Sequence, residues 1–334
     1  MNLSMFFGRT VLTFVCIMHT NIVFAEKIAY PLTLSKEQLI QYQQNNFKIL
    51  GVVQFKRQSE AGKPITELSG LAWDTDDKIL YAVSDRGYVL HLIPDIQDQN
   101  LKSVILAAYY PLEDANGRPL NGIYADSEGI TLINHINSKI NDTELLISFE
   151  RKPRIIRYTT KGEYISEMPL NKALKDIKHY SGSNKALEAI TMHKTYGIIT
   201  GPERPLKTDI TDLSLHSQHN HKWLFKPDND KYGSLVGMSS LPDDRIILLE
   251  RIFPGVFSGV TNVIHLVELS NSNIKQEKLL KLLPVDAFFN DNFEGISWHE
   301  RKRFFMISDD NDNLLQRTVL VYFEIPKLGM PNDD

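Results

Sequence analysis

The chain has 334 residues, and 37 Lys and Arg stand against 41 Asp and Glu, a formal net charge of −4 at pH 7. This mild acidic balance gives no support for a nucleic-acid partner or an anionic membrane surface, which both favour basic proteins. The one cysteine is Cys16, so we expect stability to come from a large hydrophobic core rather than from disulfides.

Residues 1–25 have the pattern of a secretory signal peptide. Arg9 precedes the apolar run Val11–Met18, and Val23-Phe24-Ala25 supplies the small residue of a cleavage site. A membrane anchor is the alternative, but this run is too short to span about 30 Å of hydrocarbon. We therefore expect a periplasmic or secreted protein, cleaved near Ala25 and without a membrane span.

The next residues divide into three parts. Residues 26–46 are predicted to be an N-terminal helical segment, with a helix over Ser35–Gln44 whose start carries the capping pair Ser35 and Gln38. Residues 47–326 are predicted to form the main domain, and residues 327–334 a tail.

A short phrase recurs five times in the main domain: a small or acidic residue, an apolar step, a turn, an apolar run and an acid. The five copies start at Ser69, Glu128, Glu188, Val236 and Glu294, at intervals of 59, 60, 48 and 58 residues. Self-similarity at such a period is typical of radial or solenoid arrays.

Each copy reads as two strands joined by a hairpin turn, and third and fourth strands follow in most copies, such as Tyr88–Ile93 with Val104–Tyr110. Four strands per repeat predict an all-β fold, a five- or six-bladed β-propeller with four-stranded antiparallel blades. The last repeat has a third strand at Val319–Ile325 but no fourth. We expect Phe47–Phe55, an N-terminal strand, to close the ring.

The repeated acids should meet at one mouth of the propeller channel. The first and second strands of a hairpin are antiparallel, so the start of one lies beside the end of the other. Glu128, Glu188 and Glu294 should therefore point to this mouth, and they are the predicted catalytic residues. The acids that end the second strands should lie close to them: Asp85, Glu150, Glu203, Glu250 and Asp309.

Gathered carboxylates repel one another unless a cation lies among them. One candidate is Ca²⁺, which takes six to eight oxygen ligands. The other is the arginine that follows the acid in four repeats, which could also hold an anionic substrate. These arginines are Arg86, Arg151, Arg204 and Arg251. In the structural alternative, the acids and arginines only tie one blade to the next.

Two further groups of residues carry weaker signals. Asp309-Asp310-Asn311-Asp312-Asn313 alternates oxygen donors, but Leu314 stands where a calcium loop needs glycine, so a polar loop is expected. His216, His219 and His221 could bind a transition metal, but an exposed polar loop is the preferred interpretation. No serine-hydrolase elbow, HExxH pair, P-loop or GxGxxG turn occurs in the sequence.

Several motifs recur in order from about Phe47 to Ile325, among them Ser69-Gly70-Leu71-Ala72-Trp73, Asp126-Ser127-Glu128-Gly129-Ile130 and Asn292-Phe293-Glu294-Gly295-Ile296. In these motifs the chain resembles the phytase-like domain family described as having esterase-like activity. The resemblance implies a β-propeller that hydrolyses an ester or a phosphate monoester with calcium. The implied metal ligands are Asp85, Glu128, Glu188, Glu294 and Asp309, and the implied anion-binding residues are Arg86, Arg151 and Arg204. The sequence departs from the pattern at Ser69 and Val236, which replace glutamate, and at Gly201-Pro202, predicted to interrupt a strand.

The leading hypothesis is an exported, monomeric hydrolase of a small anionic or ester substrate, in which Ca²⁺ activates water and arginines hold the developing charge. A non-catalytic propeller that binds a ligand or protein is the first alternative. A lactonase-type calcium propeller is the second, because such propellers also begin a blade with Glu-Gly.

Overall fold

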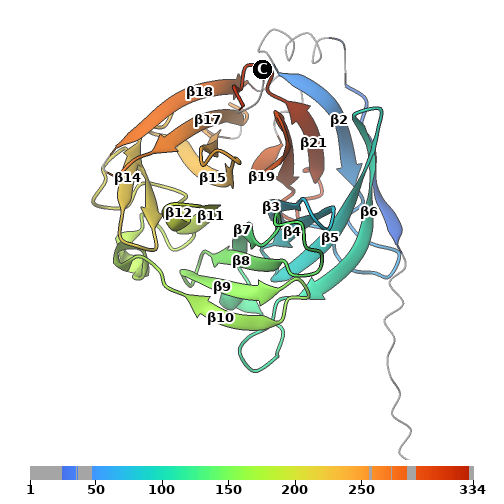
Figure 1. The fold of residues 1–334 in the computed structure, drawn as a ribbon, viewed down its shortest axis with the longest axis horizontal. Coiled ribbons are helices and arrows are strands. Elements are labelled where there is room, and N and C mark those ends of the chain that lie inside the picture. Colours follow the sequence, from blue (N-terminus) through green and yellow to red (C-terminus); the bar gives the residue numbers. More distant parts are fainter. Residues whose placement is uncertain are drawn as a thin grey trace, which may run out of the picture.

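The computed structural model describes residues 25–34, 36, 47–255, 258–271, 273–283 and 291–330. Its antiparallel sheets stand around a central axis and turn their inner strands toward that axis, which is the arrangement of a β-propeller (Figure 1). Apart from Ala25 and Lys36, the predicted signal peptide and the predicted helix Ser35–Gln44 lie outside the described residues. In the part of the chain that is described, no helix is long and apolar enough to cross a membrane.

Three sheets have four strands each, as the repeat period predicted. From the axis outward, the first contains β7 (Ser127–Ile133), β8 (Glu144–Phe149), β9 (Arg154–Thr159) and β10 (Tyr164–Met168). The second contains β11 (Leu187–His193), β12 (Gly197–Pro202), β13 (Leu213–Ser217) and β14 (Lys222–Phe225). The third contains β15 (Gly233–Ser240), β16 (Ile246–Ile252), β17 (Thr261–Leu269) and β18 (Ile274–Leu282). Short 3-10 helices occupy Gly122–Tyr124, Lys172–Leu174 and Ile177–His179.

The fourth sheet has nine strands. In spatial order they are β19 (Asn292–Glu300), β20 (Arg303–Asp309), β21 (Val319–Glu324), β2 (Lys48–Phe55), β1 (Glu26–Pro31), β6 (Asn100–Pro111), β5 (Tyr88–Gln97), β4 (Ile79–Ser84) and β3 (Leu68–Asp74). The N-terminal strand β2 pairs with β21, the last strand of the chain.

Two expectations for individual segments were wrong. Glu26–Pro31, placed in a helical segment, is a strand, because the free edges of β2 and β6 offer it hydrogen-bond partners on both sides and bury Ile28 and Ala29 completely. Gly201-Pro202 does not interrupt the third return strand, since β12 continues to Pro202 at its end, where it pairs with Leu187.

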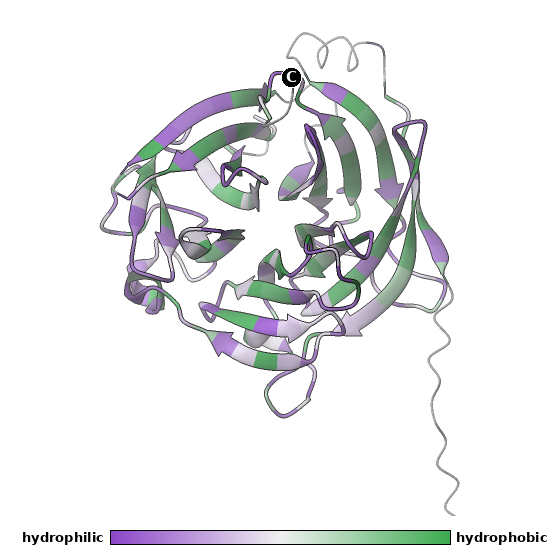
Figure 2. Ribbon diagram, viewed as in Figure 1, coloured by the Kyte–Doolittle hydropathy of each residue, from purple (hydrophilic) through white to green (hydrophobic). Residues whose placement is uncertain are grey.

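The five inner strands form a closed circle. β3 contacts β7, β7 contacts β11, β11 contacts β15, β15 contacts β19, and β19 contacts β3 again. Every residue of β3 is buried, whereas exposed and partly buried residues alternate along the outer strand β10. Hydrophobic and hydrophilic residues alternate along many strands, and hydrophilic residues dominate the loops (Figure 2). The core therefore lies between sheets that share buried faces.

Each inner strand carries a β-bulge at the first residue of the repeated phrase. The register shifts between Leu68 and Gly70, Ser127 and Ile130, Leu187 and Ala189, Leu235 and Gly237, and Phe293 and Gly295. Bulges re-aim side chains and are frequent next to active sites. The bulges here lie at Ser69, Glu128, Glu188, Val236 and Glu294.

The glycine after the bulge lets adjacent inner strands approach closely. A Cβ on Gly129 would lie 2.6 Å from the carbonyl oxygen of Glu188, and one on Gly237 would lie 2.5 Å from that of Glu294. Both distances are too short for a side chain, so only glycine fits at these positions. In the Glu-Gly pair of the repeat, the glutamate lies at the bulge and the glycine allows the neighbouring strand to come close.

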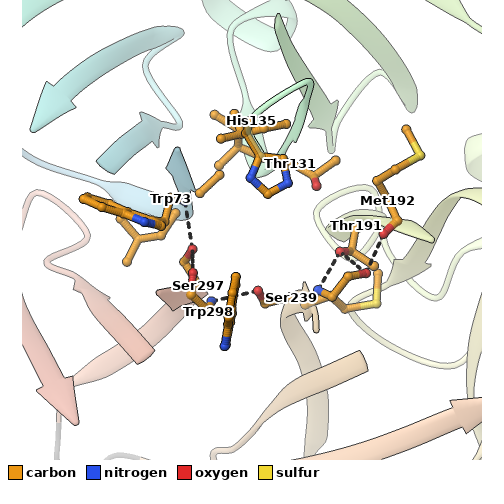
Figure 3. A pocket seen from close by; sticks show the side chains of 14 residues that line it. Trp73, Thr131, His135, Thr191, Met192, Ser239, Ser297 and Trp298 are labelled. Atoms are coloured by element: carbon orange, nitrogen blue, oxygen red, sulfur yellow. Dashed lines mark hydrogen bonds between the residues drawn. The ribbon is translucent and has the colours of Figure 1, made fainter. Parts of the chain in front are cut away.

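Hydroxyl groups join neighbouring inner strands farther along the same repeat. The amide of Trp73 donates to Ser297 Oγ (2.9 Å), that of Trp298 to Ser239 Oγ (2.8 Å), and that of Ser240 to Thr191 Oγ1 (2.9 Å) (Figure 3). These bonds explain the Ser or Thr that follows the apolar step in most repeats. They connect neighbouring inner strands, which do not pair with one another through backbone hydrogen bonds among the described residues.

Candidate functional site

Among the described residues, eight carboxylates lie at the end of the channel where the inner strands begin. We call this set the acid mouth: Asp85, Asp126, Glu128, Glu150, Glu188, Glu203, Glu294 and Asp309. The bulges supply Glu128, Glu188 and Glu294. These three residues are at most 8% exposed.

Two groups of three carboxylates have ligand oxygens within 4.8 Å of one another. The first is Asp126, Glu128 and Glu150, and the second is Glu150, Glu188 and Glu203. Glu150 belongs to both. Such clusters of hard oxygen donors suit Ca²⁺ or Mg²⁺ rather than a soft transition metal.

Burial and mutual repulsion raise the pKa values of most of these groups. Burial, followed by the charges of neighbouring carboxylates, raises the pKa of Asp85, Glu128, Glu188 and Asp309 well above the usual range. Burial and the nearby Glu203 raise the pKa of Glu150 to about 8. Such values mark groups that a cation or a proton must stabilise.

Arg251 is the arginine that lies among the acids. Its guanidinium donates to Glu203 Oε1 (3.0 Å), to Asn292 Oδ1 (2.5 Å) and to Glu294 Oε1, and only 14% of its side chain is exposed. Burial alone would raise the pKa of Glu203, but Arg251 and Lys185 hold it below its usual value. Lys185 Nζ lies 2.6 Å from the other oxygen of Glu203.

The other three predicted arginines have different contacts. Arg86 binds Glu67 and Asp312, and Arg151 binds Asp126 (3.1 Å), with 44% and 53% of the two arginine side chains exposed. Arg204 donates to the backbone carbonyls of Gly233 and Lys231. The four arginines therefore do not form one ring.

Glu250, expected beside the other acids, binds elsewhere. Its carboxylate accepts the amide of Asp228 (2.8 Å) and lies 2.7 Å from His265 Nε2. This contact set ties the loop before β15 to the third sheet. Glu250 therefore fits the structural alternative, in which the repeated acids tie parts of the propeller together.

The two weaker groups of residues have structural contacts. In the Asp309–Asn313 loop, Asp310 is buried and binds Arg57 (2.9 Å), as expected of a polar loop. His216 does not lie in an exposed loop: it is 1% exposed within β13, because the strand continues to Ser217. His221 stacks on Trp223, and the described residues show no metal-ligand group that contains these histidines.

Sequence reasoning missed Asp126 and Asn292 as site residues. Each lies two residues before a bulged glutamate, in Asp126-Ser127-Glu128 and Asn292-Phe293-Glu294. Asn292 binds both Arg251 and Glu294, and Asp126 completes the first group of three carboxylates. The shared spacing was the signal that could have revealed them.

The opposite end of the channel has different chemistry. A pocket there is lined by Trp73, Trp298, His135 and the hydroxyl residues that join the inner strands, without any Asp, Glu, Lys or Arg (Figure 3). The clustered carboxylates therefore belong to the acid mouth.

A basic pocket borders the acid mouth next to Arg251. We use this name for the pocket lined by Lys185, Glu203, Arg204, Lys231, Tyr232, Ser234, Arg251 and Phe253. Its four cations and one acid make it a place where an anion would be favoured.

The four-stranded sheets and the closed circle of inner strands define the class of the protein as a β-propeller, with clustered carboxylates at one mouth of its channel. Residues 63–312 match the family model named Phytase-like, which is described as esterase-like activity of phytase, and the chain belongs to this family. The predicted family is thus confirmed. No curated relative matches the sequence.

Solved structures that resemble the chain include three with low sequence identity. A gluconolactonase from Xanthomonas campestris has 10% identity and a TM-score of 0.42, with 90% of this chain and 97% of that chain covered. The propeller domain of Cps50 (Swd1) from Myceliophteria thermophila has 10% identity and a TM-score of 0.38, with 84% and 93% covered. U3-55K has 8% identity and a TM-score of 0.37, with 82% and 83% covered.

Proposed function

We propose that the chain hydrolyses an ester or a phosphate monoester at the acid mouth, with a divalent cation, Ca²⁺, as its cofactor. The observation that carries this proposal is the excess of buried carboxylates over cations at one end of the channel. Among the described residues, Arg251, Lys185 and Arg151 are the cations that pair with the eight acids. Membership of the Phytase-like family supports the same activity.

The donor set fits such an ion. Asp126, Glu128 and Glu150 offer carboxylate oxygens within one coordination sphere, and Glu188, Glu294, Asp85 and Asp309 surround them. A bound Ca²⁺ supplies Lewis acidity, which lowers the pKa of water and polarises an ester or phosphoryl oxygen.

The residues of the chain have separate roles in this proposal. Glu128, Glu188 and Glu294 orient the reacting groups and accept protons at their carboxylate oxygens. Glu150 belongs to both groups of three carboxylates, so it would hold the ion together with Asp126 and Glu128.

The basic pocket supports an anionic substrate. Lys231 and Arg204 lie on its wall beside Arg251, and Tyr232 and Phe253 add aromatic surface. A small molecule with a phosphate or carboxylate group can place its charge there while its ester bond lies at the acid mouth. Arg86 and Arg151 are proposed to attract the same anion from the rim.

A substrate panel tests the proposal. Purified protein is assayed with p-nitrophenyl phosphate, p-nitrophenyl acetate and a sugar lactone, with millimolar Ca²⁺ or with EDTA. We expect calcium-dependent release of product that falls at least tenfold in Glu128→Gln and Glu294→Gln. Hydrolysis of the lactone alone would favour the lactonase alternative. Absence of any turnover, together with no calcium-dependent rise in melting temperature, would refute the proposal.

We further propose that the nine-stranded sheet is two blades joined by β1, which gives five blades around the axis. The circle of five inner strands and the pairing of β2 with β21 support this count. Export after cleavage near Ala25, and a monomeric state, belong to the same proposal.

A further inference from the structure

We infer that Arg251 is a fixed cation in one sector of the acid mouth, the sector formed by Glu188, Glu203 and Glu294. Its charge confines divalent-cation binding to the other sector, which is formed by Asp126, Glu128 and Glu150. This inference rests on the proposed function, since it concerns the ion proposed there. It makes Arg251 a positioning residue rather than an anion-binding one. It also predicts how many ions the chain binds.

The contacts of Arg251 already use its guanidinium. Its two terminal nitrogens donate to acceptors from two other hairpins, Glu203 at the end of β12 and Asn292 and Glu294 in β19. Asn292 Nδ2 also donates to Glu294 Oε1 (2.8 Å), which fixes this carboxylate. An arginine that is only 14% exposed and has such partners cannot turn toward a substrate without breaking ion pairs, which is costly when the pairs are largely buried.

The fourth repeat explains why an arginine lies at this position. Val236 stands there at the bulge that carries a glutamate in three of the other repeats. The missing carboxylate leaves room at the mouth, and Arg251 from the second strand of the same hairpin extends between the neighbouring acids. Replacing one acid and adding one cation lowers the negative charge of this sector by two.

Glu128 and Glu188 then form a matched pair. They occupy the same bulge in successive repeats and belong to the two different groups of three carboxylates. Arg251 acts on the charge of Glu188, whereas the strongest charges that act on Glu128 are carboxylates, those of Asp85, Glu188, Glu150 and Glu294. The cation of the other sector, Arg151, pairs with Asp126 (3.1 Å) but has 53% of its side chain exposed, so solvent screens its charge. A divalent cation therefore gains more from binding beside Glu128 than beside Glu188, where Arg251 is fixed.

Calorimetric titration with CaCl₂ of the mature chain, stripped with EDTA, tests the inference. We expect one ion per wild-type chain. Glu128→Gln should weaken binding at least tenfold, and Glu188→Gln should change it less than threefold. Arg251→Gln should bind two ions, because the freed carboxylates no longer have their cation.

Two control variants separate charge from folding. Arg204→Gln removes the arginine at the same place in the preceding hairpin, which donates to backbone carbonyls, and should still bind one ion. Arg251→Lys keeps a cation and should also bind one. If Arg251→Gln does not fold, the comparison of Glu128→Gln with Glu188→Gln decides alone.

The outcomes distinguish the two proposals. Two ions on the wild-type chain, or equal losses in Glu128→Gln and Glu188→Gln, would overturn the role of Arg251 and leave the metal-dependent hydrolase intact. No binding of calcium to the wild-type chain would overturn both. A single ion in folded Arg251→Gln, bound as in the wild type, would overturn the inference alone.

Discussion

The hydroxyl bonds between inner strands predict a specific loss of stability. Thr191 and Thr131 occupy the same position in successive repeats, but only Thr191 Oγ1 accepts a backbone amide within the described residues, that of Ser240 at 2.9 Å, and it also lies 2.9 Å from Ser240 Oγ. Substitution by valine keeps the shape and removes the oxygen. An amide left without its partner costs about 1–3 kcal/mol when buried, and Ser240 is half-buried, so we expect Thr191→Val to lower the free energy of unfolding by about 1–2 kcal/mol.

Guanidinium unfolding followed by tryptophan fluorescence measures this loss. Thr131→Val is the matched control, since the hydroxyl of Thr131 has no hydrogen bond within the described residues, and it should change the free energy by less than about 0.5 kcal/mol. Equal effects of the two substitutions would refute the argument that these hydroxyls join the strands.

Three further predictions concern the channel and the core. Gly237→Ala should lower the free energy of unfolding by about 1–3 kcal/mol, because its Cβ would lie 2.5 Å from the Glu294 carbonyl oxygen; an unchanged melting temperature would contradict the close approach of the strands. In EDTA, Glu128→Gln should raise the melting temperature more at pH 8 than at pH 5, because it removes a buried charge that forms as pH rises; a lower melting temperature at pH 8 would contradict the repulsion. Burial lowers the pKa of His216 to about 4, so the unfolded chain takes up this proton first and wild-type stability falls as pH drops from about 6.5 toward 4. The stability of wild type relative to His216→Gln should thus fall by about 1.5 kcal/mol between pH 6.5 and pH 5 in guanidinium titrations, whereas parallel pH profiles would contradict the shift.

The hairpins could be predicted from the sequence because their signals are local. Alternating apolar residues, turn residues and a repeated acid lie within about 14 to 22 residues of each other, and the strands formed where this pattern placed them. The bulge has no such signal, although the Glu-Gly pair that accompanies it is visible. The need for glycine at position 129 comes from the neighbouring strand, whose Glu188 carbonyl oxygen would lie 2.6 Å from a Cβ on Gly129.

Long-range contacts could not be predicted in the same way. Strand β1 forms because β2 and β6 present free edges, and nothing within Glu26–Pro31 indicates those partners. In the sequence, Arg251 is one of four arginines that all follow the acid of a repeat. Its position in the structure depends on Glu203 and Asn292, which lie 48 and 41 residues away in opposite directions along the chain. Side chains that meet across repeats depend on the closed circle, which a single repeat does not encode.

The acids of the mouth differ from structural ties in how their charge is satisfied. Glu250 accepts backbone amides and pairs with His265, as a tie between a loop and a sheet requires. Glu128 and Glu188 sit at the corresponding end of the channel, and among the described residues no hydrogen bond reaches their carboxylates, although both residues are more than nine-tenths buried. Burying a carboxylate without a partner costs several kcal/mol, so a fold gains no stability from these two side chains. Their presence at bulges beside the other carboxylates of the acid mouth is therefore better explained by the divalent cation proposed above than by the stability of the propeller.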